Sequence, residues 1–183
     1  REYIALPFPS AEANFGLDHW QLTSAAGKHV KTDKKIPFDI PANGRTWWGG
    51  NGSQARKLAF ACAVNCPVRV YTVMGGGWGD SSRSRAKIRF VCRDGTEHAV
   101  DLMCGVHFRD HNNNPSYPCN VDDKLVTRAV FGHEHNRRLD MQRFDLPDKF
   151  HSRTLSAVIL EDNGAEGQQR VMIAAATVER RLN

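Results

Sequence analysis

Three tryptophans stand beside glycines, where the backbone can turn sharply and present a ring at the rim of a sheet. Trp47 and Trp48 precede two glycines, and Trp78 follows Gly75–Gly77, with Asp80 two residues later. Aromatic rings stack on the C–H faces of sugars, and polar side chains hydrogen-bond to the hydroxyls. These residues predict a saccharide platform. The alternative is that the rings fill the core, with one ring of the Trp47-Trp48 pair packed inward.

A second polar stretch supplies the matching hydrogen-bonding groups. Arg109, Asp110, His111 and Asn112 follow one another in a loop rich in asparagine. Hydrogen bonds that involve a charged partner are the stronger ones. We expect Arg109 and Asp110, together with the tryptophans, to make the main contacts with a glycan.

Two histidine pairs suggest a different chemistry. Histidines at such short spacings can chelate a transition metal, and a neighbouring acid can act as a general base. A metal-dependent hydrolase is therefore the alternative function, and ordinary hydrogen-bonded loop histidines are the alternative to both. The four residues are His107, His111, His133 and His135.

Five cysteines favour an oxidising compartment and hence a secreted, extracellular or periplasmic protein. Cys104 and Cys119 bracket a polar loop that a disulfide would stabilise, so this pair is predicted first. Cys62 and Cys66 flank a tight turn and form the second predicted pair. Cys92 is then left over, and the spacings match no zinc module.

Acidic residues outside the polar stretch offer little catalytic signal. Asp122 and Asp123 would form a glycosidase pair only if a second carboxyl faced them, and a solvated turn explains them as well. Asp18 and Asp33 are weak candidates for a structural calcium ion, and no cofactor is required. Gly75–Gly77 is not followed by the Lys-Ser or Lys-Thr of a phosphate-binding loop, and neither a nucleophile elbow nor a zincin helix occurs.

Composition limits the class of protein. The 183 residues suit one domain, 40% are hydrophobic and 25% charged, and the net charge of +5 favours acidic ligands. No apolar run is long enough to span a membrane, and no nucleic-acid-binding motif occurs. Arg83, Arg85, Lys87 and Arg89 alternate, which predicts a solvated basic stripe on a strand. The first residue, Arg1, suggests a processed or excised segment of a larger protein.

The chain must hold these residues on short strands joined by turns. Residues 68–74 alternate between the two faces of an extended segment and predict a central strand that ends in a glycine loop. Asp94-Gly95 is the strongest hairpin signal. Residues 1–35 predict an N-terminal edge strand and an irregular loop, and 41–52 predict a loop. The other predicted strands are 36–40, 57–64, 87–92, 98–103, 125–131, 138–146, 154–160 and 170–178.

Short strands with frequent turns and little helical periodicity predict an all-β fold, a β-sandwich of jelly-roll type over residues 1–183. The order of several segments resembles galactose-binding-like β-sandwiches, in particular the NPCBM-like carbohydrate-binding modules of secreted glycosidases. The likeness covers most of residues 36–178, and His111 stands where that family usually has tryptophan. The segments that carry it are 36–40, 71–78, 90–95, 105–110 and 174–178.

The resemblance implies a non-catalytic module that fixes a secreted enzyme, or another parent protein with further domains, to a polysaccharide or glycoprotein glycan. The basic balance makes an acidic glycan a natural ligand. A protein-interaction or sensor domain is the third possibility, because this fold does not determine function.

Overall fold

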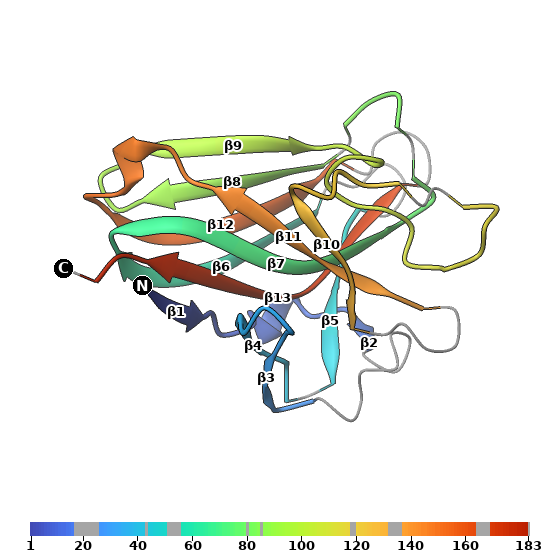
Figure 1. Ribbon diagram of the computed structural model, residues 1–183, viewed down its shortest axis with the longest axis horizontal. Helices are drawn as coiled ribbons and strands as arrows, with labels where there is room; N and C mark the ends of the chain where they lie inside the picture. Colours follow the sequence, from blue (N-terminus) through green and yellow to red (C-terminus); the bar gives the residue numbers. More distant parts are fainter. Residues whose placement is uncertain are drawn as a thin grey trace.

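The protein is an antiparallel β-sandwich. The computed structural model describes residues 1–16, 26–42, 44–50, 56–79, 81–84, 86–117, 120–131, 137–163 and 169–182. Within them, one sheet has seven strands in the order β10-β11-β7-β13-β5-β2, with β1 also paired to β13. A second sheet has the order β6-β12-β8-β9, and β3 pairs with β4. The predicted all-β jelly-roll sandwich is confirmed (Figure 1).

The elements agree with most of the predicted strands. The strands of the larger sheet are β1 (Glu2–Ala5), β2 (Phe15–Gly16), β5 (Arg45–Trp48), β7 (Pro67–Gly77), β10 (Val126–Phe131), β11 (Leu139–Asp145) and β13 (Arg170–Arg180). The others are β3 (His29–Lys31), β4 (Pro37–Asp39), β6 (Arg56–Asn65), β8 (Ala86–Cys92), β9 (Glu97–Leu102) and β12 (Thr154–Asp162), with short 3-10 turns η1 (Ser10–Glu12) and η4 (Asp148–Phe150).

Strand β7 is buried on both faces because its alternating side chains enter two separate cores. Val70 and Met74 belong to the core between the two sheets. Tyr71 and Val73 belong to a second core on the outer face of the larger sheet, which Phe38 of β4 helps to cover. The prediction of a central strand at residues 68–74 is confirmed.

Two predicted loops are wrong in part. Residues 45–48 form strand β5 rather than a loop, because they pair with β13 through Trp47 and Trp48. Gly75–Gly77 continue β7 as a strand and pair with β13. Turn residues predicted both loops, but strand partners that are distant in sequence decided the structure.

The basic residues of β8 face outward but are partly neutralised. Arg89 hydrogen-bonds to Glu97 at 2.7 Å and to Glu161 at 2.8 Å, and Lys87 lies 4.0 Å from Asp101. Cross-strand pairing therefore replaces a free basic stripe with a mixed charged surface.

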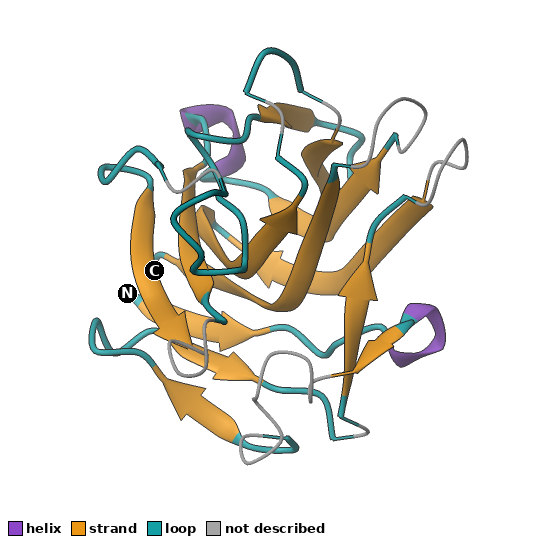
Figure 2. Ribbon diagram, turned by 90° about the vertical axis from the view of Figure 1, so that its right-hand side faces the viewer, coloured by secondary structure: helices purple, strands orange, loops and turns teal. Residues whose placement is uncertain are grey.

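Both chain ends lie at one end of the sandwich, on the left of Figure 1. The loop between β9 and β10 lies at the opposite end, where β7 also ends. Figure 2 views the molecule from that end and shows how loops surround the ends of the strands. The residues described next gather there.

Candidate functional site

Consecutive tryptophans on β5 point in opposite directions because side chains alternate along a strand. Trp47 lies opposite Ile173 and is 2% exposed in the core between the sheets. Trp48 lies opposite Met172 and packs against the outer core. Of the predicted pair, Trp48 lines two pockets, whereas Trp47 lies in the core.

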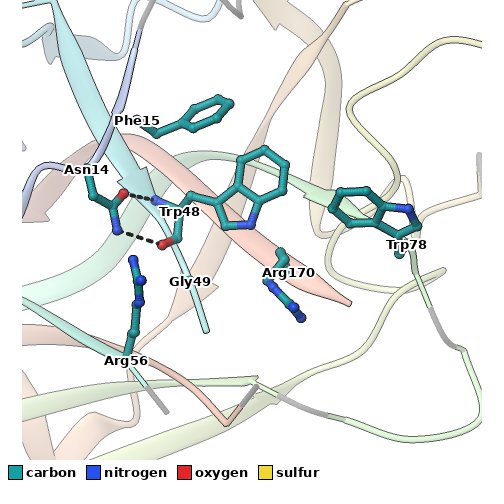
Figure 3. Close-up of a pocket in the computed structure, with 7 residues that line it drawn as sticks. All are labelled: Asn14, Phe15, Trp48, Gly49, Arg56, Trp78 and Arg170. Carbon is teal, nitrogen blue, oxygen red and sulfur yellow. Dashed lines mark hydrogen bonds between the residues drawn. The ribbon is translucent and has the colours of Figure 1, made fainter. Parts of the chain in front are cut away.

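Trp48 is held by its neighbours before any ligand arrives. The Asn14 side chain donates to Trp48 O at 3.0 Å and accepts from Trp48 N at 2.8 Å (Figure 3). The Phe15 ring lies 4.5 Å from the Trp48 ring, centroid to centroid, at an angle of 60°. This clamp orders both the backbone and the indole of Trp48.

Trp78 follows β7 in a conformation that tryptophan rarely adopts. Its φ is 52°, in the left-handed region, which costs a residue other than glycine about 1–2 kcal/mol. Its N–H donates to Asp110 Oδ2 at 3.1 Å, and 51% of the residue is exposed. The ring lies 5.7 Å from Trp48 at 50°. A strained backbone that displays an aromatic ring to solvent is typical of a binding site.

Gly76 allows a distant loop to lie against the end of β7. Its N–H donates to Arg109 O at 2.9 Å, and its carbonyl accepts from His111 N at 2.8 Å. A Cβ at this position would lie 2.5 Å from the Phe108 ring. Glycine is therefore required here, and the contact brings Asp110 and His111 close to Trp78.

Asp110 is buried, and its carboxylate organises the backbone. Besides Trp78 N, it accepts the Asn112 N–H at 2.8 Å through Oδ1. Asp110 and Asn112, both predicted ligand contacts, line a pocket beside Trp78. These two hydrogen bonds indicate that Asp110 holds the backbone of Trp78 in place.

Arg109 lies away from the pockets. Its Nε and Nη2 donate to the two carboxylate oxygens of Asp140 at 2.6 and 2.8 Å, and the residue is 6% exposed. Arg109 is a predicted ligand contact, but in the structure its guanidinium ties the loop to β11 through Asp140.

The histidines that the structure describes have separate partners. His111 Nδ1 lies 2.8 Å from Gly76 O, so Nδ1 carries the proton, and burial lowers the pKa of the imidazole. His107 Nδ1 accepts the Met103 N–H at 3.0 Å, and burial lowers its pKa as well. His133 and His135 lie outside the described residues.

Two pockets adjoin Trp48 and Trp78. The larger is about 450 Å³ and is lined by Asn14, Phe15, Gly49, Arg56 and Arg170 as well as the two tryptophans (Figure 3). The smaller is about 200 Å³ and adds Gly77, Asp110, His111, Asn112 and Tyr117. Because both contain Trp48 and Trp78, we call them together the tryptophan groove.

Several residues that line the pockets are not predicted from the sequence. Asn14 and Phe15 lie in a segment without a clear period, and Arg56 and Arg170 each begin a strand. Tyr117 is 40% exposed in the loop between β9 and β10. Their residue types suit binding, but nothing in their spacing indicates that they meet. Asp80, predicted to join them, lies outside the described residues.

The predicted disulfide between Cys62 and Cys66 is wrong. The Cys62 thiol lies on β6 and donates to Leu155 O at 3.5 Å, and burial raises its pKa to about 11. Cys66 lies in the turn before β7, with φ at 52°. The pairing of Cys104 with Cys119 stays a prediction, because Cys119 lies outside the described residues.

The candidate metal ligands do not gather in the described part of the chain. No group of three His, Cys, Asp or Glu side chains lies close enough there to hold an ion. Asp33 is exposed between β3 and β4, and Asp18 lies outside the described residues. Asp123 accepts from Arg128 at 2.7 Å, which fits a solvated turn. No described helix has the length and apolarity needed to cross a bilayer.

Comparisons with known proteins add little to this geometry. No protein family matches the sequence, and no curated protein matches it. Among solved structures, the chain is similar to CBM27-1 of Caldicellulosiruptor saccharolyticus, whose crystal structure is a complex with mannohexaose. The TM-score is 0.43 and the identity 9%, over 98% of this chain and 97% of that one. A likeness of this size carries no conclusion about function.

Proposed function

We propose that the protein is a non-catalytic carbohydrate-binding module and that the tryptophan groove holds a glycan. The observation that carries this proposal is the pair Trp78 and Trp48. The Trp78 ring is half-exposed on a strained backbone, Trp48 is clamped by Asn14, and both tryptophans line two pockets. Saccharides suit such a surface because their C–H faces stack on aromatic rings.

The polar groups around the rings support the same ligand class. Asn112, His111 and Tyr117 line the smaller pocket, while Asn14 and two arginines line the larger. Amides, imidazoles and phenols both donate and accept hydrogen bonds, as sugar hydroxyls do. A binding surface with several such groups around an aromatic centre gives a sugar both affinity and orientation.

A glycan ligand implies that the module works outside the cell or in the periplasm, attached to a larger enzyme or to another parent protein. The proposal excludes a nucleic-acid ligand and needs no cofactor. It assigns no catalytic residue, and it treats His111 as part of the groove rather than as a metal ligand.

The test is a glycan array probed with the wild type, Trp78→Ala and Tyr3→Ala. Tyr3 is the matched control, because it is also an exposed aromatic residue but packs against Tyr71 on another part of the sheet. We expect selective binding by the wild type and Tyr3→Ala and at least a roughly 30-fold loss in Trp78→Ala, as for a central contact residue.

Circular dichroism and thermal unfolding of each variant establish that it is folded. No binding to any glycan by the folded wild type would overturn the proposal and favour a protein-interaction domain. Equal losses of glycan binding in Trp78→Ala and Tyr3→Ala would show that the binding site is not in the groove.

A further inference from the structure

We infer that the larger pocket of the tryptophan groove recognises an anionic substituent of the glycan, a carboxylate or a sulfate, through Arg56 and Arg170. This inference rests on the proposed function and adds the chemical class and orientation of the ligand. The charged sugar unit lies at the arginine end, and the neutral part of the chain extends past Trp78 toward Asn112 and His111.

Arg170 is the main support for the inference. It is the first residue of β13, opposite Gly77, so its side chain lies beside the last residue of β7 before Trp78. Figure 3 shows its side chain among the residues that line the pocket, below the two tryptophan rings in this view. Only 7% of the residue is exposed.

The guanidinium of Arg170 lacks an acidic partner among the residues that the structure describes. Its Nη1 donates to the carbonyl of the adjacent Gln169 at 2.7 Å, and no described carboxylate forms an ion pair with it. Burying a cation is costly unless hydrogen bonds and an opposite charge compensate it. An anion bound in the pocket would supply both.

Arg56 adds a second guanidinium from the opposite sheet. It begins β6 and lines the same pocket. Asp162 lies opposite it in the strand register, but that carboxylate is buried and accepts the Val171 N–H at 2.9 Å through Oδ2. No ion pair between Asp162 and either arginine is present in the described structure. The pocket therefore carries two positive side chains beside its aromatic wall.

The shape of the groove favours a sugar acid over a bare inorganic anion. Phe15, Trp48 and Trp78 form its apolar side, and stacking there needs a ring with C–H faces. Planar guanidinium groups bind carboxylate and sulfate oxygens with paired N–H donors. The aromatic residues thus stack on the sugar ring, and the arginines bind its charged substituent.

The test compares glycans that differ in charge alone. Matched pairs are oligogalacturonate with its methyl ester, and dextran sulfate with dextran, added to the array that tests the proposed function. Calorimetry then measures the affinity for each member that binds the wild type, Arg56→Met, Arg170→Met and the control Arg153→Met. Arg153 is an arginine paired with Asp94 outside the groove.

We expect the wild type to bind an anionic member at least about 10-fold more tightly than its uncharged partner, as for charge-assisted hydrogen bonds. Each groove variant should remove most of this difference, and Arg153→Met should keep it. Added salt should weaken only the anionic binding. If Arg170→Met fails to fold, Arg56→Met provides the same comparison.

Three outcomes would overturn the inference. Binding to neutral glycans alone, or equal affinity within both pairs, would contradict the anionic ligand while the proposed function stands. A preference that persists in the groove variants would place the anion elsewhere. Absence of binding to every glycan on the array would contradict both proposals.

Discussion

Arg109 and Arg170 are buried to nearly the same extent, with 6% and 7% of each residue exposed, but their surroundings differ. Arg109 binds both oxygens of Asp140. Arg170 has a backbone carbonyl as its described partner and faces a pocket. Burial therefore does not distinguish the two arginines, whereas the charge of the described partner does. Arg109 lies in the loop whose Asp110 accepts the Trp78 N–H, and Arg170 lies in the groove.

Breaking the Arg109 pair should give the largest effect. In Asp140→Ala a buried guanidinium loses its carboxylate, and this should lower the free energy of unfolding by about 3–5 kcal/mol. Urea unfolding measures the change. Asp123→Ala is the control, because it breaks an exposed pair with Arg128 and should leave stability nearly unchanged. Equal stability of the two variants would mean that the Arg109 pair contributes nothing.

Acidification should lower the stability of the protein through buried histidines, among them His111 in the loop that contains Arg109. Burial lowers the pKa of His111, and the nearby Arg137 and Arg138 lower it further, although the Gly76 hydrogen bond and Asp110 oppose them. Burial likewise lowers the pKa of His98 and His107. Below the ordinary histidine pKa of about 6.5, the unfolded chain therefore binds protons first, and stability falls. Above it, these groups are neutral in both states.

Urea unfolding at about pH 7.5 and about pH 5.5 measures this loss of stability. His111→Gln should show a smaller difference between the two pH values than the wild type. An unchanged difference would show that His111 does not contribute.

A smaller effect on stability than in Asp140→Ala is expected for Arg170→Met. Methionine fills a similar volume, and no described carboxylate loses a partner, so the free energy of unfolding should change by less than about 1 kcal/mol. The same denaturation experiment compares it directly with Asp140→Ala. A loss of several kcal/mol, as in Asp140→Ala, would make Arg170 a structural residue and remove the contrast between the two arginines.

Local pattern predicts most of the strands. Alternation at residues 68–74 predicts the central strand, and Asp94-Gly95 predicts the β8–β9 hairpin, because both depend on neighbours in sequence. The error at residues 45–48 has the opposite cause. Glycines flank this segment, but pairing with β13, more than 120 residues later, makes it a strand.

The same distinction between local and long-range causes applies to the candidate site. Residue type and spacing indicate Trp48 and Trp78 as aromatic contacts beside glycines. They do not predict that Arg109 is tied to Asp140, or that Arg56 and Arg170 line one pocket with Trp48. Each of these arrangements brings together elements that are far apart in the sequence.

The sequence by itself determined the all-β class, the central strand and the aromatic and polar side chains available for binding. These depend on the two-residue period of strands and on local turn chemistry. Only the tertiary structure decided which tryptophan faces the groove, because the register of β5 on β13 sends Trp47 into the core and Trp48 outward. It also decided which arginine has a carboxylate, because long-range packing selects the partners of a buried charge.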